Sequence, residues 1–123
     1  MGYETKLHVA IRTESGYCEI IASINLCKAG EAFNELTKQN SSDHNCYYFT
    51  KGETEVKVTT DDYERNISVM APTDVLDCLK SEIDLDIKNN TSPYRRFLLA
   101  QSLISNILET FHKEDIVVLG YGY

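Results

Sequence analysis

The chain has 123 residues, the length of one typical domain, and its 19 acidic and 12 basic side chains give a net charge of −7. This acidic balance argues against direct binding of DNA or RNA, because that affinity depends on cations meeting phosphates. The sequence shows no leader with a basic and then an apolar segment, and no run of about 20 apolar residues. We therefore expect a cytoplasmic protein without a membrane span, folded as a single domain over residues 1–123.

Two alternating segments open the chain and predict an antiparallel hairpin. Over residues 3–13 apolar side chains recur at every second position, which is the period of a half-buried strand. A turn signal at residues 14–16 precedes a second alternating run over residues 17–27. One face of this second strand is predicted to carry Cys18, Ile20, Ala22, Ile24 and Leu26.

A short helix and a meander of three strands are predicted next. Residues 30–39 have helical spacing, with Phe33 and Leu36 three positions apart. The strand-like segments that follow are 46–50, 53–60 and 63–71. The last two are expected to be joined by a turn at Asp61-Asp62, because short polar residues favour turns.

Two longer helices are predicted over about residues 73–87 and 92–112. Thr73 or Asp74 is expected to cap the first helix, because short polar side chains accept hydrogen bonds from first-turn amides. Ser92-Pro93 is expected to open the second helix, since serine accepts hydrogen bonds from free first-turn amides and proline suits the first helical position.

The order of these elements predicts an α+β fold. An unbroken apolar run at residues 116–119 is typical of a buried last strand. We expect an antiparallel-rich sheet of about five or six strands with the two longer helices packed on one face.

All of the net charge lies in residues 53–86. This stretch holds ten acidic side chains and three basic ones, a balance of −7, and the nine acids and nine bases elsewhere cancel. A field of one sign attracts cations or basic protein surfaces. The plainer alternative is a solvated face without a partner, because charge runs are commonly just wet surface.

The charge pattern favours a small non-enzymatic binding protein, of the inhibitor or adaptor kind, that docks an acidic face on a basic protein surface. The residues expected to form this face are Glu53, Glu55, Asp61, Asp62, Glu64, Asp74 and Asp77. Small acidic proteins that block nucleic-acid-handling enzymes, including bacteriophage proteins, share this charge balance, so such an enzyme is one candidate partner. No cofactor is expected. No metal site is expected at residues 61–67, which lack the glycine and ligand spacing of a calcium loop.

A small-ligand binding or sequestering domain is the alternative. Its pocket would hold a nucleotide-like ligand, at a subunit boundary. The residues expected to line it are Tyr48, Tyr63, Arg65, Tyr94, Arg95 and Arg96. The sequence also leaves open self-association through an unpaired sheet edge or through the flank of the long helix.

An enzymatic reading finds little support in the sequence. Asp43, His44 and Cys46 lie close together, and an imidazole can activate a thiol. No recognised cysteine-hydrolase signature surrounds Cys46, however, and the common nucleotide, hydrolase and metalloprotease motifs are missing from the chain. We therefore predict that the protein is not an enzyme. Enzymatic activity would require a cleft in which at least two of the following meet: His44, Cys46, Asp61, Asp62, His112 and nearby acids.

Overall fold

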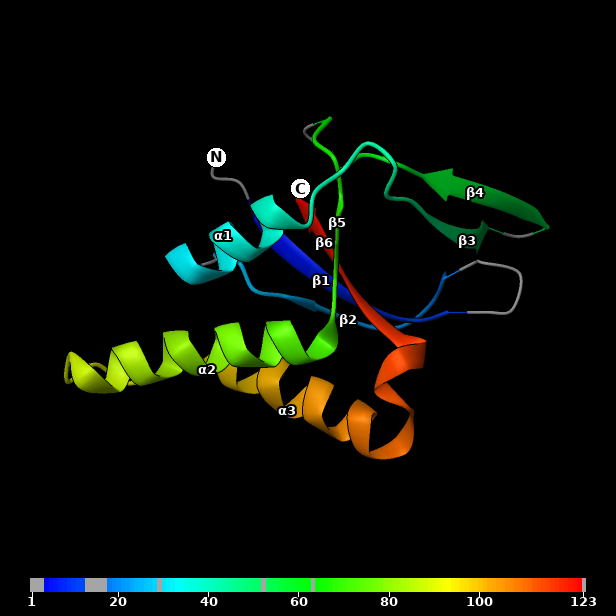
Figure 1. The fold of residues 1–123 in the computed structure, drawn as a ribbon. Coiled ribbons are helices and arrows are strands. Elements are labelled where there is room, and N and C mark those ends of the chain that lie inside the picture. The colour runs from blue at the N-terminus through cyan, green and yellow to red at the C-terminus, as the bar shows by residue number, and fades with distance from the viewer. Residues whose placement is uncertain (1–3, 13–17, 29, 52, 63, 123) are drawn as a thin grey trace.

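The computed structural model describes residues 4–12, 18–28, 30–51, 53–62 and 64–122, and these form an α+β fold (Figure 1). The strands are β1 (Thr5–Arg12), β2 (Cys18–Asn25), β3 (Tyr47–Lys51), β4 (Thr54–Val58), β5 (Ser68–Met70) and β6 (Ile116–Gly122). The helices are α1 (Glu31–Gln39), α2 (Pro72–Lys88) and α3 (Arg95–Thr110), and a 3-10 turn, η1 (Lys113–Asp115), precedes β6. The predicted α+β fold class is confirmed, and the main antiparallel sheet has four strands in the described ranges where about five or six were expected.

The strands form two sheets. One is a four-stranded antiparallel sheet in the order β2-β1-β6-β5, and the other is the β3-β4 hairpin. The predicted continuation of the meander from β4 into residues 63–71 is therefore wrong. The amide of Asp61 donates to the carbonyl of Arg65 at 2.9 Å, and this tight turn redirects the chain so that β5 pairs with β6.

The two longer helices cover one face of the four-stranded sheet, and the β3-β4 hairpin lies on the other side (Figure 1). Leu7 and Val9 of β1 share the main core with Leu79 of α2 and Ile104 of α3. The opposite face carries a smaller core. Its buried members are Ala10, Ile67, Val117 and Leu119, and the partly buried Val58 of β4 packs against them. β6 thus buries side chains on both faces, which explains its unbroken apolar run.

A β-bulge in β2 changes which side chains face the helices. The register with β1 shifts at this point, because Val9 pairs with Ala22 whereas Ala10 pairs with Ile20. Ala22 therefore packs on the main core and Ile20 on the smaller one, although the two residues are two positions apart. The predicted common face of residues 18–26 is wrong across this point, because one inserted residue reverses the alternation.

Both longer helices begin at other residues than predicted. α2 begins at Pro72 with Ala71 as its N-cap, and α3 begins at Arg95 with Tyr94 as its N-cap. Neither N-cap side chain makes a capping hydrogen bond. At α3 the amide of Tyr94 donates instead to a carboxylate oxygen of Asp86 at 3.1 Å, so the preceding helix supplies the acceptor that Ser92 was expected to supply.

Candidate functional site

The structure divides the predicted acidic face into two groups, one at each end of β5 (Figure 1). Glu53, Asp62 and Glu64 lie with the β3-β4 hairpin and the loop that follows it. Asp74 and Asp77 lie on α2, beyond the other end of β5. The side chain of Glu55 lies outside the part of the chain that the structure describes. The described carboxylates therefore form two surfaces rather than one.

Asp61 differs from the other acids of the first group because its side chain is only 7% exposed. One carboxylate oxygen accepts the amide of Arg65 at 3.0 Å, and the carbonyl of Asp61 accepts the amide of Glu64 at 3.1 Å. Glu64 itself has a φ of 60°, in the left-handed region that tight turns use. Asp61 thus closes a turn and is not part of an accessible acidic surface, contrary to the expectation.

The second group forms a stripe along α2. Asp74, Asp77 and Asp84 are exposed and follow one another at intervals of three and seven residues, which places them on one face of the helix. The opposite face is buried through Val75 and Leu79. None of the three carboxylates forms an ion pair within the described ranges. We call Asp74, Asp77 and Asp84 the acidic stripe.

Two further acids of α2 have internal partners. A carboxylate oxygen of Glu82 accepts the amide of Ala32 in the first turn of α1 at 3.1 Å. Gly30 makes room for that carboxylate, since a Cβ at Gly30 would overlap it. Asp86 accepts the amide of Tyr94, as described above. These two carboxylates satisfy free amides at helix starts, so they belong to the fold and not to the stripe.

Exposed apolar side chains lie where α2 ends and α3 begins. Ile87 in the last turn of α2 is 57% exposed, and Leu99 in the first turns of α3 is 60% exposed. Leu85 and Leu98 are also exposed. The bond between Asp86 and Tyr94 brings these ends of α2 and α3 together. The two helices and the turn between them form a helical hairpin, distinct from the β3-β4 hairpin. We call Leu85, Ile87, Leu98 and Leu99, at the end where α2 meets α3, the hairpin tip.

The sequence reasoning did not single out the hairpin tip, although one signal was present. Leu98 and Leu99 are adjacent in a helix whose buried positions are Phe97, Ala100 and Ile104. Adjacent helical residues point about 100° apart, so an apolar pair beside an already complete buried stripe leaves at least one side chain in solvent.

The residues of the predicted tyrosine-arginine pocket lie in three places. Tyr48 is on β3, where the Lys57 ammonium lies 6.0 Å from its ring centroid, and Arg65 is in the loop after β4. The hydroxyl of Tyr94 donates to the carbonyl of Leu26 at 2.8 Å.

The arginine pair lies beside Tyr94. Arg96 donates to the carbonyl of Asn25 at 2.6 Å, and Arg95 is exposed. Burial raises the pKa of Tyr94, as does the neighbouring Cys27. Tyr63 lies outside the described residues. The described members of the pocket therefore do not converge on one cavity, and two of them, Tyr94 and Arg96, connect the start of α3 to the end of β2.

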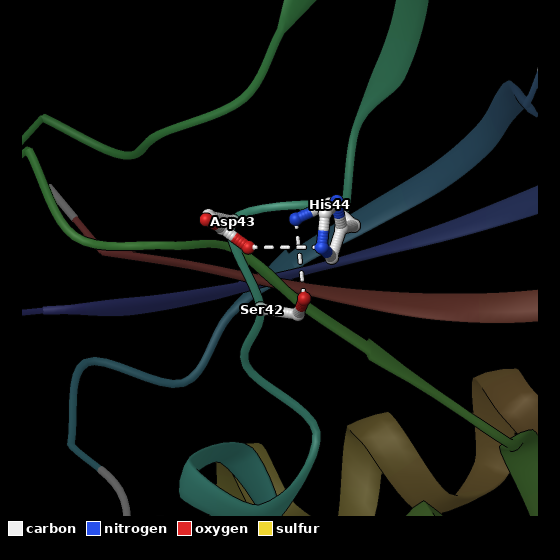
Figure 2. Close-up of polar contacts among 3 residues, drawn as sticks. All are labelled: Ser42, Asp43 and His44. Atoms are coloured by element: carbon white, nitrogen blue, oxygen red, sulfur yellow. Dashed lines mark hydrogen bonds and ion pairs between the residues drawn. The ribbon is translucent and has the colours of Figure 1, made fainter.

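The candidate cysteine-histidine cluster lies on the surface (Figure 2). An imidazole nitrogen of His44 is 3.5 Å from a carboxylate oxygen of Asp43, and the amide of His44 donates to the hydroxyl of Ser42 at 3.1 Å. The side chains of His44 and Asp43 are 93% and 80% exposed. Cys46 is half-buried, and no hydrogen bond joins it to His44 in the described ranges. This pair is solvated and its charge interaction is screened.

Another thiol, that of Cys78 on α2, lies against α1. Its sulfur donates to the carbonyl of Ala32 at 3.4 Å. Burial raises the pKa of Cys78, and the carboxylates of Glu82, Asp74 and Asp77 raise it further. The surroundings therefore favour the thiol over the reactive thiolate.

No protein-family model matches this chain, and no curated protein or solved structure matches it either. Within the described residues, no group of three or more histidine, cysteine, aspartate or glutamate side chains is placed to hold a metal ion. The helices found in those residues are too short or too polar to cross a membrane.

Proposed function

We propose that this chain is a small acidic binding protein, without enzymatic activity, that docks α2 and the hairpin tip on a basic protein surface. The observation that carries the proposal is the acidic stripe, whose three carboxylates are exposed, share a helix face and lack an ion pair within the described ranges. A basic protein that handles nucleic acid is a candidate partner, as with other small acidic inhibitors. We expect the protein to act in the cytoplasm, where thiols such as Cys27 stay reduced.

The stripe and the tip have different roles in this proposal. An exposed ion pair contributes roughly 0–1 kcal/mol, so the stripe mainly speeds encounter and sets the orientation of the partner. Full burial of one leucine side chain contributes roughly 1.5–3 kcal/mol, so the tip supplies most of the affinity. We therefore expect the basic surface of the partner to border an apolar patch that receives Leu99 and its neighbours.

The proposal is tested by comparing two triple variants that remove the same charge from different places. The first variant neutralises the acidic stripe and is Asp74→Asn/Asp77→Asn/Asp84→Asn. The second neutralises the exposed acids near the β3-β4 hairpin and the loop after it, and is Glu53→Gln/Asp62→Asn/Glu64→Gln. Each variant and the natural chain are used to capture partners from a host lysate, which mass spectrometry identifies. The association rate of the purified partner is then measured from about 50 to about 500 mM salt.

We expect the stripe variant to associate about ten times more slowly at low salt and to lose most of the salt dependence. The matched variant should keep both, apart from the small effect of net charge. Leu99→Ser should instead speed dissociation. Equal slowing by both triple variants would show that net charge alone attracts the partner, and would overturn the assignment of the surface to α2.

A further inference from the structure

A polar hollow of about 700 Å³ opens between α1, the loop after β4 and the neighbouring end of the four-stranded sheet. Cavities of about 300–1,000 Å³ are the usual size for small-molecule sites. Its lining residues are Thr5, Asn34, Thr37, Lys38, Ser41, Asp61, Glu64, Arg65, Asn66, Ser68 and Gly120. None of them belongs to the acidic stripe or the hairpin tip, so this hollow is separate from the proposed docking surface.

The floor of the hollow consists of small residues on three adjacent strands. Thr5 of β1, Gly120 of β6 and Ser68 of β5 are all buried. A Cβ at Gly120 would lie 3.3 Å from the terminal carbon of Met70 and 3.4 Å from the Cβ of Ser68, so the backbone approaches closely here. Larger side chains at these positions would fill the space that the hollow occupies.

Hydrogen bonds fix the floor to α1. The hydroxyls of Ser41 and Ser68 both donate to the carbonyl of Thr37, at 2.7 and 2.9 Å, and lie 3.0 Å from each other. The side-chain amide of Asn45 donates to the carbonyls of Asn40 and Ile67, at 2.7 and 3.0 Å. The end of α1 and the segment entering β5 are therefore held in place, and the hollow is preformed.

The two walls of the hollow are polar. Asn34, Thr37 and Lys38 occupy one face of α1, because they are spaced three and four residues apart. Glu64 and Asn66 come from the loop that Asp61 closes. Polar walls of this kind gain little from contact with each other and keep their hydration when no ligand is bound.

The charges on the walls point to the class of ligand. Lys38 on α1 and Glu64 on the loop both line the hollow, yet they form no ion pair with each other in the described structure. Arg65 and Asp61 add one further charge of each sign to the lining. A ligand with two opposite charges can engage both walls, whereas an anion alone would meet the carboxylates and a cation alone the basic groups.

We infer that this hollow binds a small zwitterion, an α-amino acid with a polar side chain, whose carboxylate faces Lys38 and whose ammonium group faces Glu64. Asn66 lines the hollow with an exposed side chain. The hydroxyls of Thr37 and Ser41 donate to backbone carbonyls of α1, and their oxygens can still accept hydrogen bonds from the polar side chain of the ligand. An apolar side chain would displace the water that hydrates these groups without replacing its hydrogen bonds, and would be disfavoured.

The inference is tested by titrating the isotope-labelled protein with each common amino acid to about 10 mM and recording amide spectra. N-acetylated and amidated forms of the amino acid that binds, together with inorganic phosphate, serve as probes of each charge. We expect saturable shifts at Thr37, Ser41, Ser68 and Gly120 with at least one polar amino acid. Each blocked form should bind about ten times more weakly, and phosphate should cause no saturable shift at these amides.

Variants locate the two charges of the ligand. Lys38→Gln and Glu64→Gln should each weaken binding about tenfold, while Lys57→Gln and Glu35→Gln, outside the hollow, should not. Spectra of the unliganded variants report whether the fold is kept. Absence of saturable shifts with every amino acid would overturn the inference. Saturable binding of phosphate that depends on Lys38 but not on Glu64 would also overturn it, in favour of a simple anion site.

Discussion

His8 is a partly buried titratable residue on β1. Its ring nitrogen lies 2.6 Å from the hydroxyl of Ser23 on the paired strand β2. Partial burial, together with the smaller effect of the nearby Lys6 charge, lowers the pKa of His8 from 6.5 to about 4. The folded chain therefore keeps this imidazole neutral at a pH at which the unfolded chain protonates it.

This difference predicts a pH dependence of stability. Between pH 6.5 and about 4 the unfolded state binds a proton at His8 that the folded state does not. The free energy of unfolding therefore rises with pH in this window, and falls as the solution is acidified from 6.5 toward 4. We expect His8→Gln to flatten this part of the profile, measured by urea unfolding at about pH 7 and about pH 5.

A matched control is available on the surface. His44→Gln removes an imidazole that is 93% exposed, and this change should leave the acid-side slope as it is in the natural chain. If His8→Gln and the natural chain lost the same stability on acidification, the loss would belong to other groups, and His8 would have no part in it.

Among the helices, the start of α3 shows how far a sequence pattern can locate an element. The apolar spacing predicts α3 correctly, because a helix repeats its buried face every three to four residues. The predicted start at Ser92 is wrong because Asp86, on another helix, accepts the hydrogen bond. A cap supplied from elsewhere in the fold leaves no signal in the local sequence.

The two possible caps can be distinguished by substitution. We expect Asp86→Ala to lower the free energy of unfolding by about 1 kcal/mol, since it removes the acceptor for the Tyr94 amide. Ser92→Ala should change it by less than about 0.5 kcal/mol, because Ser92 is exposed and lies before the N-cap residue. Chemical denaturation of both variants measures the difference, and a larger loss for Ser92→Ala would reject the cap by Asp86.

The strands set a second limit on prediction. Alternation correctly places Leu7 and Val9 of β1 on the helix-covered face. It fails in β2 because the bulge inserts a residue without changing the composition of the run. Alternation also does not predict which strands pair with each other. β5 pairs with β6, across about 50 intervening residues, and not with the strand that precedes it in the chain.

At the scale of the whole molecule, the net charge predicted an acidic surface but not its shape. The net charge includes Glu82, Asp86 and Asp61 together with the exposed acids. In the structure each of these three carboxylates accepts a hydrogen bond from a backbone amide of the fold. The polar hollow gave no signal at all, because its lining residues come from four separate parts of the chain and share no motif. Such a site depends on tertiary structure, which a local pattern does not encode.

The acids of α2 therefore divide into two kinds that one comparison can separate. Asp77→Ala/Asp84→Ala and Glu82→Ala/Asp86→Ala remove the same charge from the same helix. We expect the first pair to change the free energy of unfolding by less than about 0.5 kcal/mol, because exposed carboxylates that form no ion pair with the described residues contribute little. The second pair should cost about 2 kcal/mol, because it leaves the amides of Ala32 and Tyr94 without acceptors.

Urea unfolding at low and high salt measures both pairs. Salt should change the first result more than the second, since exposed charges are screened and the helix-start hydrogen bonds are local. Equal losses for the two pairs would mean that the exposed aspartates also stabilise the fold, and the stripe would then need no partner to explain it. The expected asymmetry would leave Asp77 and Asp84 as charges that the fold itself does not require, as a docking surface demands.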